Sequence, residues 1–185
     1  MSSQDAGAGA GAQPAAALVK DGAVIADAWV RAADDAPLPT DAPVLVGKAR
    51  FLAEAAELRG RNAPVGLVLR NTESLDGLEG DLNRFALIVL EFPAFADGRA
   101  YSQARLLRER NGYRGALRAE GDVLWDQIPL MKRCGFDEFL IRDPRVARAL
   151  VEGRIRDVPV HYQPAARDDV ELQPPGARPW LRLDG

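Results

Sequence analysis

The chain contains very little cysteine and histidine. Its 185 residues include one cysteine, Cys134, and one histidine, His161. One thiol cannot form a disulfide within the chain, and an iron–sulfur cluster or a structural zinc site needs several thiolate or imidazole ligands. We therefore expect no internal disulfide and no metal centre of these kinds. A reduced, intracellular environment is the simplest one for such a chain.

Long apolar runs and a targeting segment are also missing. No run approaches the roughly 20 apolar residues that span a bilayer, and residues 1–17 lack the positive flank and Leu-rich core of a secretory signal. The net charge of −3 gives the chain no general attraction to nucleic acid or to an anionic membrane. These absences predict a cytoplasmic protein that binds neither nucleic acid nor membrane.

The common cofactor motifs are absent as well. The chain has no G-x-G-x-x-G after a strand, no Walker A lysine motif, no C-x-x-C and no H-E-x-x-H. A nicotinamide or flavin would therefore have to bind without its usual phosphate loop. The sequence alone therefore identifies no cofactor.

What is present is the composition of a single globular domain. Hydrophobic residues make up 47% and charged residues 28% of the chain, which is enough to bury a substantial core. Residues 1–17 form an Ala/Gly-rich tail that we expect to be disordered, and the Pro-rich stretch 163–185 is expected to be irregular. The domain is predicted to occupy residues 18–162.

Strands and helices are predicted to alternate within this domain. A strand or short hairpin over residues 24–30 leads into it. Short apolar runs typical of buried strands follow at residues 44–46, 65–69, 86–90, 115–119, 136–141 and 158–162. Amphipathic segments between them predict helices over 48–59, 74–84, 99–110, 122–134 and 144–151.

This order predicts an α/β fold with a mostly parallel sheet, because short connections through helices join parallel strands by right-handed crossovers. An open doubly wound sheet and a partial (β/α) barrel both fit the pattern. The chain is too short for a complete eight-unit barrel.

Arginines stand where three of the predicted strands end. Arg70, Arg118 and Arg142 take equivalent places in three units, and Arg99 adds a fourth. In α/β folds the ligand lies beyond the carboxyl ends of the strands. A guanidinium offers a planar fork of donors for sulfate, phosphate or carboxylate oxygens, so this rim predicts an oxyanion site. The alternative is that the arginines pair with the acidic residues at the same strand ends, Glu73, Glu91, Glu120 and Asp143.

The loop after the third main strand supplies further candidates. Asp97 is expected to cap the following helix and to orient Arg99. Tyr101 is a candidate hydrogen-bond donor to the anion, and Arg105 lies one helical turn further on the same face. Ser102 is a ligand candidate at the helix start, but no histidine lies near it to activate it as a nucleophile.

Asp122 repeats this arrangement one unit later. It follows Gly121, and we expect it to cap the next helix and to orient Arg118.

Three stretches carry a resemblance to a known family. They are LEFPAFADGRAYSQARLLRER at 90–110, GALRAEGDVL at 115–124 and RCGFD at 133–137. Over about residues 40–145 the chain resembles a proteobacterial family of domains of unknown function. Members of that family are labelled as oxidoreductases and are encoded beside assimilatory sulfite reductase and the sulfate-reduction genes of cysteine biosynthesis.

The resemblance implies an accessory protein of assimilatory sulfate or sulfite reduction, which binds a small oxyanion or the sulfite reductase itself. Two alternatives stay open. One is a small-molecule enzyme on a barrel-like scaffold, with Glu91 or Asp122 as the acid or base. The other is an interaction module whose rim arginines meet an acidic surface of the reductase.

Overall fold

The continuous apolar runs of the sequence become buried strands. The computed structural model describes residues 16–94 and 96–155. Within them the strands are β1 (Ala17–Lys20), β2 (Ala23–Ile25), β3 (Val30–Arg31), β4 (Val44–Gly47), β5 (Val65–Leu69), β6 (Leu87–Phe92), β7 (Ala116–Gly121) and β8 (Glu138–Ile141). The helices are α1 (Lys48–Ala53), α2 (Ala55–Arg59), α3 (Arg99–Arg105), α4 (Ile128–Arg133) and α5 (Pro144–Val151), with a short 3₁₀ turn η1 (Leu82–Arg84) and a π-helical turn η2 (Leu106–Arg110).

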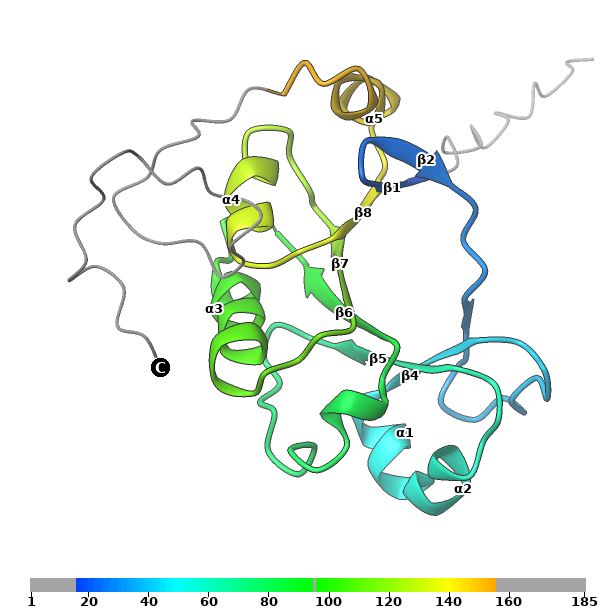
Figure 1. Ribbon diagram of the computed structural model, residues 1–185. Coiled ribbons are helices and arrows are strands. Elements are labelled where there is room, and N and C mark those ends of the chain that lie inside the picture. The colour runs from blue at the N-terminus through cyan, green and yellow to red at the C-terminus, as the bar shows by residue number, and fades with distance from the viewer. Residues whose placement is uncertain (1–15, 95, 156–185) are drawn as a thin grey trace, which may run out of the picture.

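The described strands form one eight-stranded sheet in the order β2-β1-β8-β7-β6-β5-β4-β3. Strands β3 to β8 are parallel and follow one another without a reversal of order, while β1 is antiparallel to both β2 and β8. Figure 1 shows the sheet curled into a half-barrel with helices on its outer side. The predicted α/β fold is confirmed, and the unreversed strand order selects the partial barrel over the doubly wound sheet.

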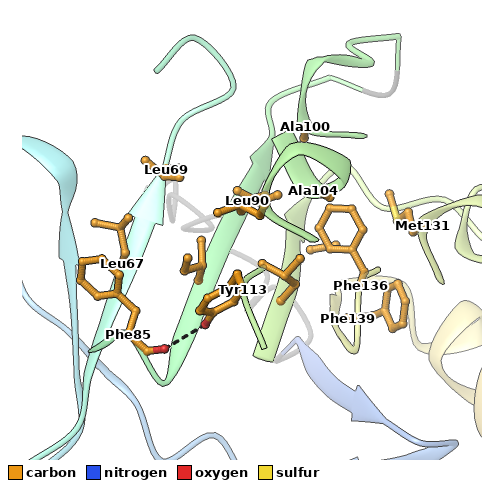
Figure 2. Close-up of a cluster of buried hydrophobic side chains, with 14 of the residues drawn as sticks. Leu67, Leu69, Phe85, Leu90, Ala100, Ala104, Tyr113, Met131, Phe136 and Phe139 are labelled. Carbon is orange, nitrogen blue, oxygen red and sulfur yellow. Dashed lines mark hydrogen bonds between the residues drawn. The ribbon is translucent and has the colours of Figure 1, made fainter. Parts of the chain in front are cut away.

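The outer face of the sheet carries the main hydrophobic core. Alternate strand residues such as Leu67 and Leu90 are fully buried beneath the helices (Figure 2). Helix α3 presents Ala100 and Ala104 to this core, and both are fully buried. Small residues four positions apart let the helix lie close to the sheet. Tyr113 brings a hydroxyl into the same core, where it donates to the carbonyl of Phe85 at 3.0 Å, so its burial leaves no unsatisfied polar group.

A short segment closes the inner, concave face. Strands β2 and β3 lie at opposite edges of the sheet, so the chain between them must cross the hollow of the half-barrel. We call residues 26–31 the strap. Its Trp29 packs on inner-face side chains that include Leu45 and Val89. The hollow is therefore filled at this level by an aromatic side chain from the strap.

The strand or short hairpin predicted over residues 24–30 is misplaced. The hairpin is β1–β2, which spans residues 17–25 and turns at Asp21 and Gly22, both of which have positive φ. Two other predictions are confirmed. Helix α5 has the predicted bounds 144–151. Gly112 and Gly135 have positive φ after the preceding helices, as the stop signals predicted.

The helix predicted over residues 74–84 is wrong. Only the 3₁₀ turn Leu82–Arg84 forms there, because Gly77 adopts φ +82° and breaks the helical pattern early in the segment. The segment predicted as one helix over 48–59 is two short helices that meet at Glu54.

Two further helix predictions need correction. The helix expected from Asp122 begins only at Ile128, with Pro129 at its start, so Asp122 is not its N-cap. The helix expected over 99–110 is α-helical only to Arg105 and continues as the π-turn η2.

Some expectations fall outside the described residues. They are the predicted strand 158–162, the C-terminal tail 163–185, and all but the last two residues of the N-terminal tail 1–17. None of the described helices has both the length and the apolar character that crossing a membrane requires.

Gly66 of β5 leaves little space between its backbone and the neighbouring Leu45 and Trp29 side chains. A Cβ added there would lie 2.6 Å from Leu45 Cδ2 and 3.0 Å from Trp29 Cζ3. Gly66→Ala should therefore lower the free energy of unfolding by about 1–3 kcal/mol through overpacking. The matched control is Gly80→Ala, since Gly80 has nothing within 4 Å and no positive φ. Urea unfolding of both variants tests this, and equal stabilities would contradict the packing of Trp29 on β5.

Candidate functional site

A cavity of about 790 Å³ opens at the carboxyl ends of β6, β7 and β8. We call it the mouth pocket. Its apolar wall includes Phe92 and Val146, from the end of β6 and the first turn of α5. Its charged lining residues are Arg31, Glu91, Glu120, Asp122, Arg142 and Asp143. The pocket lies where the strand order predicts a ligand site in a parallel sheet.

An arginine of the strap bridges two carboxylates in the mouth pocket. Glu91 and Glu120 are neighbours in register on β6 and β7. Arg31 donates from Nη1 to Glu91 Oε1 at 3.2 Å, and its Nη2 forms a short contact with Glu120 Oε2. The side chain of Arg31 is 47% exposed, so this ion triplet faces the solvent of the pocket. It joins the strap to the two central strands.

Arg118 lies one inward-facing row deeper than this triplet. Its side chain is only 1% exposed and meets three carboxylates. Nη1 and Nη2 donate to Asp27 at 2.9 and 3.2 Å, Nε donates to Glu138 at 3.1 Å, and Glu120 lies at 3.5 Å. Burial alone would lower the pKa of Arg118, but the bond to Asp27 and the attraction of Glu138 outweigh it and raise the pKa.

This placement corrects the predicted position of Arg118. The strand β7 runs to Gly121, so Arg118 lies in its middle and pairs in register with Val89. Arg70, by contrast, directly follows the last residue of β5. The arginines were predicted to be equivalent, but Arg118 is inside the half-barrel and is occupied by acidic partners. For this residue the structure matches the alternative interpretation, pairing with acids.

Asp97 and Arg99 form a separate cluster at the start of α3. Arg99 Nε donates to Asp97 Oδ1 at 2.9 Å, and Asn71, just after β5, donates to the other carboxylate oxygen. These contacts, the Arg99 side chain first, lower the pKa of Asp97 to about 2. Asp97 also accepts from the backbone N–H of Arg99 at 3.2 Å, close to the predicted capping role, although the N-cap residue itself is Gly98. Neither Asp97 nor Arg99 lines the mouth pocket.

Four more predicted residues also lie outside the lining of the mouth pocket. Tyr101 stacks edge-on against Phe92 with ring centroids 5.2 Å apart, and burial raises its pKa to about 12. Ser102 is exposed. Arg105 pairs with Glu109 on its own helix at 2.7 Å. The fourth, Arg70, is exposed at the loop after β5.

Asp122 and Arg142 are the two predicted residues that do line the mouth pocket. Arg142 is exposed, and among the residues that the structure describes it makes no ion pair and no side-chain hydrogen bond. Its neighbour Asp143 is occupied, because it accepts from the N–H of Arg145 at 2.8 Å and caps α5. Arg142 is thus a guanidinium in the pocket that is available to a ligand.

Sequence reasoning missed the contribution of the strap. Arg31 and Asp27 make their ion pairs with residues 60 to 91 positions away, so no local pattern indicates them. Glu138 was missed because its partners Arg118 and Lys20 lie 20 and 118 positions away in the chain. A usable signal existed for Glu120, since it alternates with the apolar Leu117 and Ala119 and so must face the other side of the sheet. Within the described residues there is no group of three or more histidine, cysteine or acidic side chains suited to a metal ion.

A family model described as "Bacterial protein of unknown function (DUF934)" matches residues 66–172, which include most of β5, all of β6 to β8 and most of the mouth pocket. No curated protein matches the chain.

Removal of the buried guanidinium should destabilise the fold strongly. Arg118→Ala leaves Asp27 and Glu138 without their main partner, and breaking a buried ion network in this way costs about 3–5 kcal/mol. Arg142→Ala is the matched control, because its guanidinium is exposed and has no partner in the described part of the chain, and it should change the free energy of unfolding by less than about 0.5 kcal/mol. Urea unfolding compares the two. A loss for Arg118→Ala no larger than that of the control would show that the network does not stabilise the half-barrel.

Proposed function

The chain belongs to this DUF934 family of bacterial proteins of unknown function, and we propose that it is an accessory protein of assimilatory sulfate or sulfite reduction. In this proposal the mouth pocket binds a small oxyanion. The family resemblance of the sequence supports the pathway, and the geometry of the pocket supports the place of binding.

The position of Arg142 is the main observation in favour of an oxyanion site. It lines a cavity at the carboxyl ends of the strands and has no partner among the described residues. Arg31 is a second guanidinium in the same cavity. A guanidinium donates two parallel N–H bonds to a tetrahedral or pyramidal oxyanion such as sulfate or sulfite. Arg142 provides the positive charge for this interaction, because Arg31 is held by Glu91 and Glu120.

The carboxylates of the pocket limit where an anion can bind. Glu91 and Glu120 share Arg31, and Asp143 is paired with Arg145. An anion placed near Arg31 alone would approach two carboxylates closely. The favourable position is therefore beside Arg142, away from the Glu91–Arg31–Glu120 triplet.

A second candidate function is an enzyme, favoured by the adjacent carboxylates Glu91 and Glu120. Both face the pocket and both bind Arg31. Two neighbouring carboxylates with a shared cation are suited to moving a proton on a bound substrate. This function would use the same pocket but would depend on Glu91 rather than on Arg142 alone.

The binding proposal is tested by thermal-shift titration of the protein with sulfite, sulfate and phosphate. An oxyanion present at a hundred times its Kd should add about 2.7 kcal/mol of stability. Arg142→Gln should abolish this shift. Arg105→Gln is the matched control, since Arg105 pairs with Glu109 outside the pocket lining, and it should leave the shift unchanged. Stabilisation that is equal in both variants would refute the assignment to Arg142.

The pathway part is tested separately. A strain in which the gene is deleted and replaced by the Arg142→Gln variant should grow more slowly than wild type when sulfate is the sole sulfur source. The same strain should grow normally when cysteine is supplied. A pull-down with purified sulfite reductase runs alongside. Capture of the reductase with no oxyanion shift would replace the ligand site with a docking surface, and normal growth of the deletion strain on sulfate would contradict the pathway.

A further inference from the structure

A second cavity lies at the opposite end of the half-barrel. It has a volume of about 280 Å³ and is bordered by Val65, the first residue of β5, and by Phe85, just before β6. It therefore opens at the amino ends of the strands, whereas the mouth pocket opens at their carboxyl ends. The two cavities share no lining residue. We call the second one the base pocket.

The floor of the base pocket is apolar. Phe51, Leu58, Val65 and Phe85 line it, and each is at most 8% exposed. Phe51 and Phe85 are also in contact, with ring centroids 4.7 Å apart. Such a floor suits the hydrocarbon or aromatic part of a small molecule.

The rim of the base pocket is strongly basic. Arg59, Arg61 and Arg84 line it, and no acidic residue within 16–94 and 96–155 does. Asp81 lies outside the lining and binds Arg59 through Nε and Nη2 at 2.8 and 2.6 Å. Three guanidinium groups thus face one carboxylate, which leaves a surplus of two positive charges.

Two of these arginines have binding capacity left. Arg84 is 58% exposed, and its nearest described polar contacts are long, 3.6 Å to Asp81 and 3.5 Å to the carbonyl of Arg59. Among the described residues, Arg61 binds only the backbone carbonyls of Pro39 and Ala42, both through Nη2. Its Nη1 donates to none of these residues and is not among the buried atoms, so it can donate to a ligand.

We propose that the base pocket binds a small organic anion with one carboxylate or phosphate group on an apolar body. The anionic group lies between Arg61 and Arg84, and the apolar body lies on the floor formed by Phe51 and Phe85. Asp81 keeps Arg59 in place. This site is independent of the mouth pocket and of the function proposed for it.

Phenyl phosphate is a suitable probe, with benzoate as the carboxylate counterpart. Calorimetric titration of the full chain should show saturable binding, and Arg84→Gln should weaken it about tenfold because a charged hydrogen bond is lost. Arg84 is exposed and weakly bonded, so this variant should fold. Arg105→Gln is the matched control and should leave the affinity unchanged, because Arg105 lines neither pocket and pairs with Glu109.

The location is checked by NMR, where amide shifts on titration should gather at residues 58–65 and 82–85. Several outcomes would overturn the proposal: no binding at millimolar probe, shifts centred on the mouth pocket, an unchanged affinity in Arg84→Gln, or a response that sodium chloride of equal ionic strength reproduces.

Discussion

The buried guanidinium of Arg118 is the interaction on which the rest of the structure depends. A charge that is 1% exposed is tolerable only when acidic partners surround it. Those partners come from three parts of the chain: Asp27 on the strap, Glu120 on the same strand and Glu138 on β8. Lys20 on β1 in turn binds Glu138 at 3.2 Å. One side chain thus links the antiparallel edge, the parallel centre and the strap.

This network also shapes the space inside the half-barrel. It fills the centre of the concave face with ion pairs, next to the apolar packing of Trp29. The mouth pocket and the base pocket open at the two ends of the strands instead. At the mouth, Arg31 and Glu120 extend the same network to the surface, while Arg142 has no partner among the residues that the structure describes.

The sequence predicts the strands well, because buried parallel strands are continuous apolar runs. The prediction of a helix over residues 74–84 fails. The apolar residues there have helical spacing, but Gly77 adopts a positive φ that interrupts a helix. The expectation that ligands lie beyond the carboxyl ends of the strands led to Arg142 and Asp122, which line the mouth pocket. It misplaced Arg118, because a charged residue within an apolar strand looks like the end of that strand. The strap could not be found, because its ion pairs join residues far apart in the chain, and only the strand order reveals that residues 26–31 cross the hollow.

Backbone hydrogen exchange of the strap in Asp27→Asn tests the central role of the network most directly. The substitution keeps the shape of the side chain and removes the charge that faces Arg118. The amides of Val30 and Ala32, which donate to the carbonyls of Pro43 and Leu45 at 2.9 Å, should exchange at least about tenfold faster, while the amides of β6 keep their protection. Unchanged exchange at Val30 and Ala32, or an equal loss of protection in β6, would contradict the account.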